Sequence, residues 1–127
     1  MRAFIGGSAP LPPPDAWEVI EALDLASRLI ADGPILAKGN SVVWHNGVPC
    51  FCIVAAITAC SRTKQIRDAA ILATVQALPG RFNARDNSWR PTYRSRIAVF
   101  NDDARTTISD AIALLSAAKL HVGLVAA

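Results

Sequence analysis

Three cysteine thiols lie within the short stretch VPCFCIVAAITACSRT, at Cys50, Cys52 and Cys60. A thiol at the start of a helix feels the positive end of the helix dipole, which lowers its pKa and makes it a better nucleophile. Cys50 and Cys52 are expected near such a start, because Pro49 suits the first position of a helix. The pattern therefore raises the question of a cysteine-dependent enzyme.

A cysteine nucleophile needs a general base, and the chain has only two histidines. One of them, His121, lies in the stretch LHVGLVAA, which resembles the His-Val-Gly strand of the NlpC/P60 cysteine peptidases. The resemblance implies a compact papain-like or NlpC-like hydrolase, with Cys52 or Cys50 as nucleophile and His121 as base. Asn101 or Asp102 would then orient the imidazole.

The same residues also suit a structural role, which we favour. Free cysteine is among the most buried residue types and packs like a small apolar side chain. His121 is expected near a helix C-terminus, where a positive charge is favourable without any catalysis. No metal or cofactor is predicted, because Cys-x-Cys on a helix directs its thiols apart and a second ligand pair is missing.

Asn101, Asp102 and Asp103 follow one another shortly before the last predicted helix. Their oxygen atoms could bind a divalent cation, or the carboxyl groups could act as acid and base. Asp and Asn are equally suited to accept hydrogen bonds from the free amides of a helix start. We favour capping, because Thr107 and Asp110 form a capping-box pattern nearby.

The segment GRFNARDNSWRPTYRSR, residues 80–96, combines five arginines with three aromatic residues and a single acid, Asp86. Guanidinium groups bind phosphate and carboxylate, and aromatic rings stack on bases. The segment is predicted to be a loop that contacts a partner protein or nucleic acid through Arg85, Trp89, Arg90, Tyr93 and Arg94. The alternative is internal pairing, since residues 1–33 carry five acids and two arginines and could meet these arginines within the chain or across a dimer.

The composition limits the class of protein. The chain has 127 residues, 52% of them hydrophobic and 18% charged, which suits one packed domain. The net charge of +3 does not by itself indicate nucleic acid. The odd cysteine count argues against a secreted disulfide framework, and there is neither a signal-peptide pattern nor an apolar run of about 18 residues. We expect a cytoplasmic protein with reduced thiols and no membrane association.

The chain is expected to consist of a Pro-rich arm, residues 1–14, and a single globular domain, residues 15–127. The first helix begins at Asp15, which forms a capping box with Glu18. Its apolar residues recur on one side. Gly33 is expected to end this helix in the left-handed conformation, with a proline directly after it.

Two further helices and a hairpin are expected in the middle of the chain. Ser41–Trp44 reads as a short strand, followed by the turn pair Asn46-Gly47. A helix from Pro49 to Ser61 is apolar on all sides, and we expect it to lie enclosed at the centre. A third helix covers about Thr63 to Leu78, where a Pro-Gly pair stops it.

The C-terminal part is expected to hold one short strand and one helix. The strand is IAVF, residues 97–100, and the helix runs from near Thr107 to Lys119 or His121. The predicted fold class is α+β and α-dominated, with about four helices around a central apolar helix and one to three short strands.

Several of these residues resemble a family of small bacterial and phage proteins of unknown function, DUF6197. The family pattern is an amphipathic helix, a Cys-aromatic-Cys-x-x-Gly-Ala stretch, an aromatic-Asn-Asp step, an Arg-Thr pair and a final helix. Here residues 50–52 match the first step, and Ala56 matches the family alanine, whereas Ala55 stands where glycine is usual. Residues 100–102 and 105–106 match the later steps, with phenylalanine in place of tryptophan.

The resemblance covers roughly residues 16–120 and implies a bacterial or phage origin, but it implies no activity. We therefore predict a non-enzymatic interaction module whose Arg/aromatic segment contacts a partner. A protein partner or a homo-oligomer is expected first, and nucleic acid second. The cysteine hydrolase is the alternative.

Overall fold

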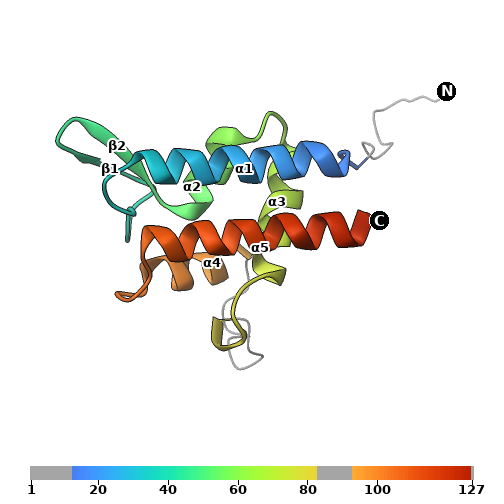
Figure 1. The fold of residues 1–127 in the computed structure, drawn as a ribbon. Coiled ribbons are helices and arrows are strands. Elements are labelled where there is room, and N and C mark those ends of the chain that lie inside the picture. The colour runs from blue at the N-terminus through green and yellow to red at the C-terminus, as the bar shows by residue number, and fades with distance from the viewer. Residues whose placement is uncertain (1–12, 83–92, 127) are drawn as a thin grey trace, which may run out of the picture.

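The computed structural model describes residues 13–82 and 93–126. Two long helices, α1 (Ala16–Asp32) and α5 (Ile108–Ala126), lie side by side and run in opposite directions (Figure 1). The start of α1 and the end of α5 therefore lie at the same end of the molecule. A third helix, α3 (Lys64–Gln76), packs against both of them at this end, and a small hairpin lies at the other end.

The start of α1 follows the predicted capping box. The backbone N–H of Asp15 donates to the side chain of Glu18 at 3.1 Å, which fixes the chain as it enters the helix. The predicted left-handed end at Gly33 is wrong, since its φ is −85° and its ψ is 148°. Gly33 lies close to β2, since a Cβ atom there would lie 3.4 Å from Sγ of Cys50.

The hairpin forms where the Asn-Gly pair predicts a turn. Strands β1 (Val42–His45) and β2 (Val48–Phe51) pair antiparallel around Asn46 and Gly47, whose φ angles are 52° and 80°. Two consecutive positive φ angles define the turn that matches strand twist, and Asn-Gly is the pair that adopts them most readily.

The helix predicted from Pro49 begins later, at Ile53, and this boundary was wrong. Pro49 belongs to β2, where it lies opposite Trp44. Both strands of a two-stranded sheet are edge strands. Proline is tolerated in an edge strand, because the position of its missing N–H can face solvent instead of the neighbouring strand. Helix α2 (Ile53–Cys60) is therefore short, and it begins directly after Cys52.

Helix α2 is buried on one face only, which corrects the expectation of an enclosed helix. Ile53, Ala56 and Ile57 are fully buried, whereas Thr58 and Ala59 are exposed. The composition of α2 did not reveal which face is exposed, because small side chains such as alanine and threonine can contact water at little cost in free energy. The long helices α1 and α5 instead pack against each other along much of their length.

The residues after α3 differ most from the prediction. A short 3-10 turn, η1 (Gly80–Phe82), follows the Pro-Gly stop, and residues 83–92 lie outside the described part. Residues 97–100, predicted as a strand, belong to helix α4 (Tyr93–Asp102). Its buried residues are Ile97, Phe100 and Asn101, a spacing of three and four that is helical and not alternating.

Helix α5 begins as predicted but runs further. The backbone N–H of Thr107 donates to the carboxylate of Asp110 at 2.9 Å, and the N–H of Asp110 donates to Oγ1 of Thr107 at 3.2 Å. The helix continues through Gly123 to Ala126, beyond the predicted end. A glycine lowers helix stability by only about 1 kcal/mol and does not stop a helix that packs along its length.

The hydrophobic core joins all five helices. Its largest fully buried apolar side chains are Leu23 and Ile30 of α1, Ile53 and Ile57 of α2, Ile97 of α4 and Leu115 of α5. The rings of Phe82 and Phe100 meet edge to face, with centroids 5.2 Å apart. The predicted α-dominated α+β fold is confirmed, with five helices and one two-stranded sheet in the described part. Of the helices described, each is either too short or too polar to cross a bilayer.

Candidate functional site

A pocket of about 420 Å³ lies where the loop before β1, the start of α2 and one side of α4 meet. Three of the predicted catalytic residues, Cys52, Asn101 and Asp102, line this pocket. Arg94, which was predicted to bind a partner, lines it as well. The tertiary structure thus brings together residues that are about fifty positions apart in the chain.

Asn101 is almost fully buried, and its amide group joins three segments. Its Oδ1 accepts a hydrogen bond from the backbone N–H of Ile53 at 2.9 Å, which satisfies the first free amide of α2. Its Nδ2 donates to the carbonyl of Ala37 at 2.7 Å and to Oδ1 of Asp102 at 3.0 Å. Asn101 therefore caps a helix, as predicted, although the helix is α2 and not the one that follows it in sequence.

Lys38 completes the same junction, although no sequence motif indicated this role. Its ammonium group donates to the carbonyl oxygens of Asn101 at 3.1 Å, Thr106 at 2.8 Å and Asp103. An ammonium group has three N–H donors, so all of them are used. These acceptors include a carbonyl left free at the end of α4, where a positive charge is favoured. Such a contact depends on two segments more than sixty residues apart, which sequence spacing does not reveal.

The remaining polar residues of the family pattern also bond within the chain. Oδ1 of Asp102 accepts from the N–H of Gly39 at 2.9 Å. Oδ1 of Asp103 accepts from the N–H of Arg105 at 2.9 Å, and the hydroxyl of Thr106 donates to the carbonyl of Phe100 at 2.7 Å. The aromatic-Asn-Asp and Arg-Thr steps therefore shape the turn between α4 and α5.

The environment of Cys52 opposes the expected activation of its thiol. Sγ accepts from the backbone N–H of Ala55 at 3.4 Å, so Cys52 does cap α2. Burial nevertheless raises the pKa of Cys52, and the charge of Asp102 raises it further, while the helix amides only partly oppose these effects. The expectation of a lowered pKa at this thiol is wrong. Cys50 is fully buried, and burial also raises the pKa of Cys60.

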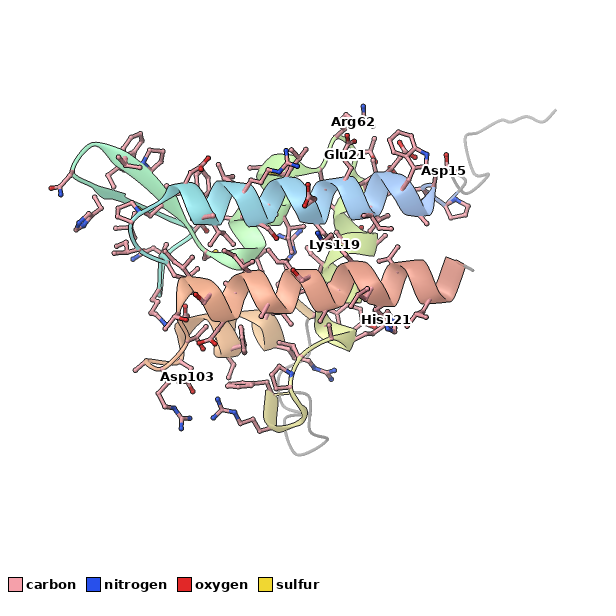
Figure 2. The ribbon with its side chains drawn as sticks, viewed as in Figure 1. Asp15, Glu21, Arg62, Asp103, Lys119 and His121 are labelled. Carbon is pink, nitrogen blue, oxygen red and sulfur yellow. The ribbon has the colours of Figure 1, made fainter. Side chains whose placement is uncertain are left out.

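His121 lies apart from the pocket that contains Cys52. It belongs to the last turns of α5 and lines a second pocket, formed with the start of α1 and with α3. Figure 2 shows His121 toward one end of α5 and Asp103 beyond the other end. Neither histidine is among the described residues that line the pocket around Cys52. The structure therefore joins Cys52 to the two proposed orienting residues but not to the proposed base.

The described part of the Arg/aromatic segment is largely exposed. The guanidinium of Arg81 lies 4.3 Å from the ring centroid of Phe82, and Tyr93 at the start of α4 is 49% exposed. Arg94 is exposed and Arg96 is half-buried. Three residues of the predicted binding set, Arg85, Trp89 and Arg90, lie outside the described residues.

Three acids of α1, Glu18, Glu21 and Asp24, are paired with other cations. Asp24 contacts Arg28 at 2.9 Å and Lys119 at 3.1 Å. Arg62 lies 3.6 Å from Glu18 and 3.8 Å from Glu21. Figure 2 shows Arg62 and Glu21 together along the upper edge of α1. Within residues 13–82 and 93–126, no ion pair joins α1 to Arg81, Arg94 or Arg96. Pairing of these arginines with the acidic first helix within one chain is thus not observed in the described part.

Metal-ligand side chains do not gather in the described part of the chain, where no group of three His, Cys, Asp or Glu side chains is close enough to hold an ion. The oxygen atoms of the Asn101–Asp103 cluster accept hydrogen bonds from backbone and side-chain donors instead. These contacts give the cluster a structural role.

Comparison with known proteins gives one match. No curated protein and no solved structure matches the chain. The family model described as "Family of unknown function (DUF6197)" matches residues 14–120. This range contains the Cys-aromatic-Cys, aromatic-Asn-Asp and Arg-Thr steps and the junction around Asn101. The chain therefore belongs to the DUF6197 family.

Proposed function

We propose that this protein is a non-enzymatic interaction module whose Arg/aromatic segment, residues 80–96, contacts a partner protein or nucleic acid. The observation that carries the proposal concerns the exposure and the ion pairing of two described arginines in this segment. Arg81 and Arg94 are exposed, and no ion pair between described residues engages either of them, whereas Glu18, Glu21 and Asp24 of α1 are already paired. In the described part of the segment, these guanidinium groups supply charge and the exposed ring of Tyr93 supplies a stacking surface for an anionic partner.

The polar residues around Cys52 support a role without catalysis. The amide of Asn101 is occupied by three hydrogen bonds, and Asp102 holds the loop before β1. A thiol whose pKa is raised carries little thiolate at neutral pH. The family pattern in this region therefore supports the junction of α2 and α4 and leaves the Arg/aromatic segment as the better candidate for function.

The cysteine hydrolase remains a second candidate because of one observation. Cys52, Asn101, Asp102 and Arg94 line the same pocket of about 420 Å³. Hydrolysis there would require a base to reach Cys52, and His121 lines a different pocket. Reactivity of the thiol would separate this candidate from the first.

We further infer a cytoplasmic location and a bacterial or phage origin. The three cysteines are free of disulfides, as expected in a reducing compartment. The origin rests on the resemblance to the family. A homo-oligomer is also consistent with an exposed Arg/aromatic segment that meets acids of a second copy.

The experiment compares two variants with equal loss of charge. Arg90→Gln/Arg94→Gln removes two charges from the segment, and Arg28→Gln/Lys64→Gln removes two exposed charges from α1 and α3. Binding is measured by fluorescence anisotropy with a labelled single-stranded DNA oligonucleotide and with labelled poly-glutamate, at several salt concentrations. The first variant should bind one of the probes at least about threefold more weakly, and its dependence on salt should fall.

The two probes distinguish the classes of partner. Binding to DNA alone indicates nucleic acid, and binding to poly-glutamate alone indicates an acidic protein. If neither probe binds, or if both variants weaken binding equally, the segment is not the interaction site.

A further inference from the structure

A pocket of about 380 Å³ lies between η1, the turn after α4 and the first half of α5. None of its lining residues belongs to the pocket around Cys52. Figure 1 shows α4 and η1 on the side of α5 that faces away from α1. The walls of this pocket therefore come from three segments that only the fold brings together.

Two guanidinium groups from different segments lie at this pocket. Arg81 belongs to η1, and Arg105 belongs to the turn between α4 and α5. Both side chains are exposed. The hydrogen bond from Arg105 holds the pKa of Asp103 below its ordinary value, and the charge of Arg81 lowers this pKa further. The two guanidinium groups therefore lie close enough to act on one carboxylate.

Both guanidinium groups keep N–H donors for a ligand. Nε and Nη2 of Arg105 lie 3.3 Å and 3.4 Å from the carboxylate of Asp103. A guanidinium has five N–H groups, so three of those of Arg105 remain. Within residues 13–82 and 93–126, the side chain of Arg81 forms no ion pair, and its guanidinium lies over the ring of Phe82.

The acids at the pocket restrict the charge of the ligand. Asp110 also lines the pocket, and its Oδ2 accepts from the N–H and the hydroxyl of Thr107 at 2.9 Å and 3.0 Å. Asp103 and Asp110 together offset the formal charge of the two arginines. Free N–H donors in a weak net field suit a singly charged carboxylate, which accepts two parallel hydrogen bonds from a guanidinium, better than a doubly charged phosphate.

The rest of the pocket wall is mainly aliphatic. It includes Pro79, Ala113, Leu114 and Ala117. The ring of Phe100 also lines the pocket, but this residue is only 6% exposed. Stacking of a nucleic-acid base requires an accessible aromatic face. The wall therefore favours an aliphatic group of a protein over a base.

The C-terminal residue of a protein combines a carboxylate with an aliphatic group. Its α-carboxylate and its side chain branch from the same Cα atom, so both can enter one pocket. Within an extended chain, neighbouring side chains point to opposite faces, so an internal acid and the aliphatic residue beside it cannot do so. The charge and the aliphatic wall together select a chain end.

We propose that this pocket binds the C-terminus of a partner protein whose last residue is aliphatic. Arg81 and the free N–H groups of Arg105 bind the carboxylate, and the side chain packs against Leu114 and Ala117. Asp103 holds the guanidinium of Arg105 in position. The proposal rests on the proposed function, because Arg81 belongs to residues 80–96, and it names the chemistry of the partner.

The first test measures binding of a peptide probe by fluorescence anisotropy. The probe is Gly-Ser-Gly-Ser-Gly-Leu with a dye on its N-terminus and a free C-terminal carboxylate. Amidation of the C-terminus should weaken binding to the wild type at least about fivefold, because the charge is lost. Replacement of the last leucine by glycine should weaken it by a similar factor. No binding of the free acid, or equal binding of its amide, would overturn the proposal.

The second test changes the pocket. Arg81→Gln/Arg105→Gln should weaken binding of the free acid at least about fivefold, whereas Arg28→Gln/Lys64→Gln should bind it like the wild type at physiological salt. Ala117→Glu adds a negative charge to the wall and should weaken binding by a similar factor. Ala59→Glu is its matched control at an exposed helical alanine.

Circular dichroism checks that each variant is folded. Ala117 is exposed, so its substitution does not disturb the core. Equal binding of the peptide by Ala117→Glu and Ala59→Glu would contradict the site even if the double arginine variant failed to fold.

Failure of this proposal is distinguishable from failure of the proposed function. Arg105 and Ala117 lie outside residues 80–96, whereas Arg90→Gln/Arg94→Gln changes only that segment. Loss of peptide binding in Ala117→Glu, with unchanged DNA and poly-glutamate binding in Arg90→Gln/Arg94→Gln, would support the pocket and contradict the role of the segment. The reverse result would overturn the pocket and retain the segment.

Discussion

Cys52 shows how two electrostatic effects compete at a single residue. The start of α2 places free amides near its sulfur, which favours the thiolate, whereas burial and the nearby Asp102 favour the thiol. Burial is the largest effect, so the pKa of Cys52 is raised. Position at a helix start is therefore insufficient to predict reactivity, because the degree of burial depends on residues from other elements.

This balance predicts the pH dependence of thiol labelling. Iodoacetamide should modify Cys52 slowly at pH 7, and the rate should increase only above the pKa of an ordinary thiol, about 8.5. Mass spectrometry of timed samples measures the rate, and the urea-unfolded protein gives the reference. His121→Ala should have no effect. Fast labelling at neutral pH that this substitution slows would favour the hydrolase.

The raised pKa of Cys52 also makes a contribution to stability that depends on pH. Because the pKa is higher in the folded state than in the unfolded state, this contribution is fully present below the unfolded pKa. It is lost as the pH rises through the folded pKa. Its loss is therefore confined to alkaline solution.

The buried side chain of Asn101 makes hydrogen bonds that stabilise the junction of α2 and α4. Asn101→Ala leaves the N–H of Ile53 and the carbonyl of Ala37 without their partners at a buried position. We expect a loss of about 2–4 kcal/mol in the free energy of unfolding, measured by urea denaturation. Asn40→Ala, at an exposed residue on the rim of the same pocket, should change the stability by less than about 0.5 kcal/mol. Equal effects would argue against the bonding role of Asn101.

At the scale of secondary-structure elements, two glycines differ in whether their backbone conformation requires glycine. Gly123 is helical and a Cβ atom there would meet nothing within 4 Å, whereas Gly47 has a φ of 80° in the hairpin turn. Gly123→Ala should raise the free energy of unfolding by about 0.5 kcal/mol, and Gly47→Ala should lower it by about 1 kcal/mol or more. Thermal unfolding of both variants measures the difference. A loss of stability in Gly123→Ala would contradict the extension of α5 to Ala126.

At the scale of the whole molecule, α1 and α5 are joined by the pair of Asp24 and Lys119. Figure 2 shows Lys119 between the two helices. The hydrogen bond from Lys119 holds the pKa of Asp24 below its ordinary value. For a lowered pKa, the stabilisation is present above the unfolded pKa and is lost as the pH falls through the folded pKa. Both side chains are partly exposed, so water screens the pair and its contribution is under about 1 kcal/mol.

This pair gives a prediction for acid unfolding. Lys119→Met should slightly lower the stability at pH 7 and reduce the loss of stability below about pH 4, because Asp24 then titrates closer to its unfolded pKa. Urea denaturation at pH 3, 4, 5 and 7 measures this, with Lys64→Met as the control at an exposed lysine. The same pH profile for Lys119→Met and the wild type would show that the pair does not couple the two helices.

Local signals in the sequence determined the helix starts at Asp15 and Thr107, the turn at Asn46-Gly47 and the fold class. The helix starts and the turn depend on atoms within about four residues, so the local sequence specifies them independently of the rest of the chain. The run of residues 97–100 was misread because a short apolar segment fits a strand or a helix equally well. Burial of Ile97, Phe100 and Asn101 on one side of α4 decided it.

Only the tertiary structure decided what the polar residues of the family pattern do. It brings Lys38 to the end of α4 and Asn101 to the start of α2, and it leaves His121 outside the pocket that contains Cys52. Contacts between distant segments depend on how whole helices pack, and burial, which sets the pKa of a thiol, depends on the same packing. The residue types were therefore visible in the sequence, while their pairing and their chemistry were set by the fold.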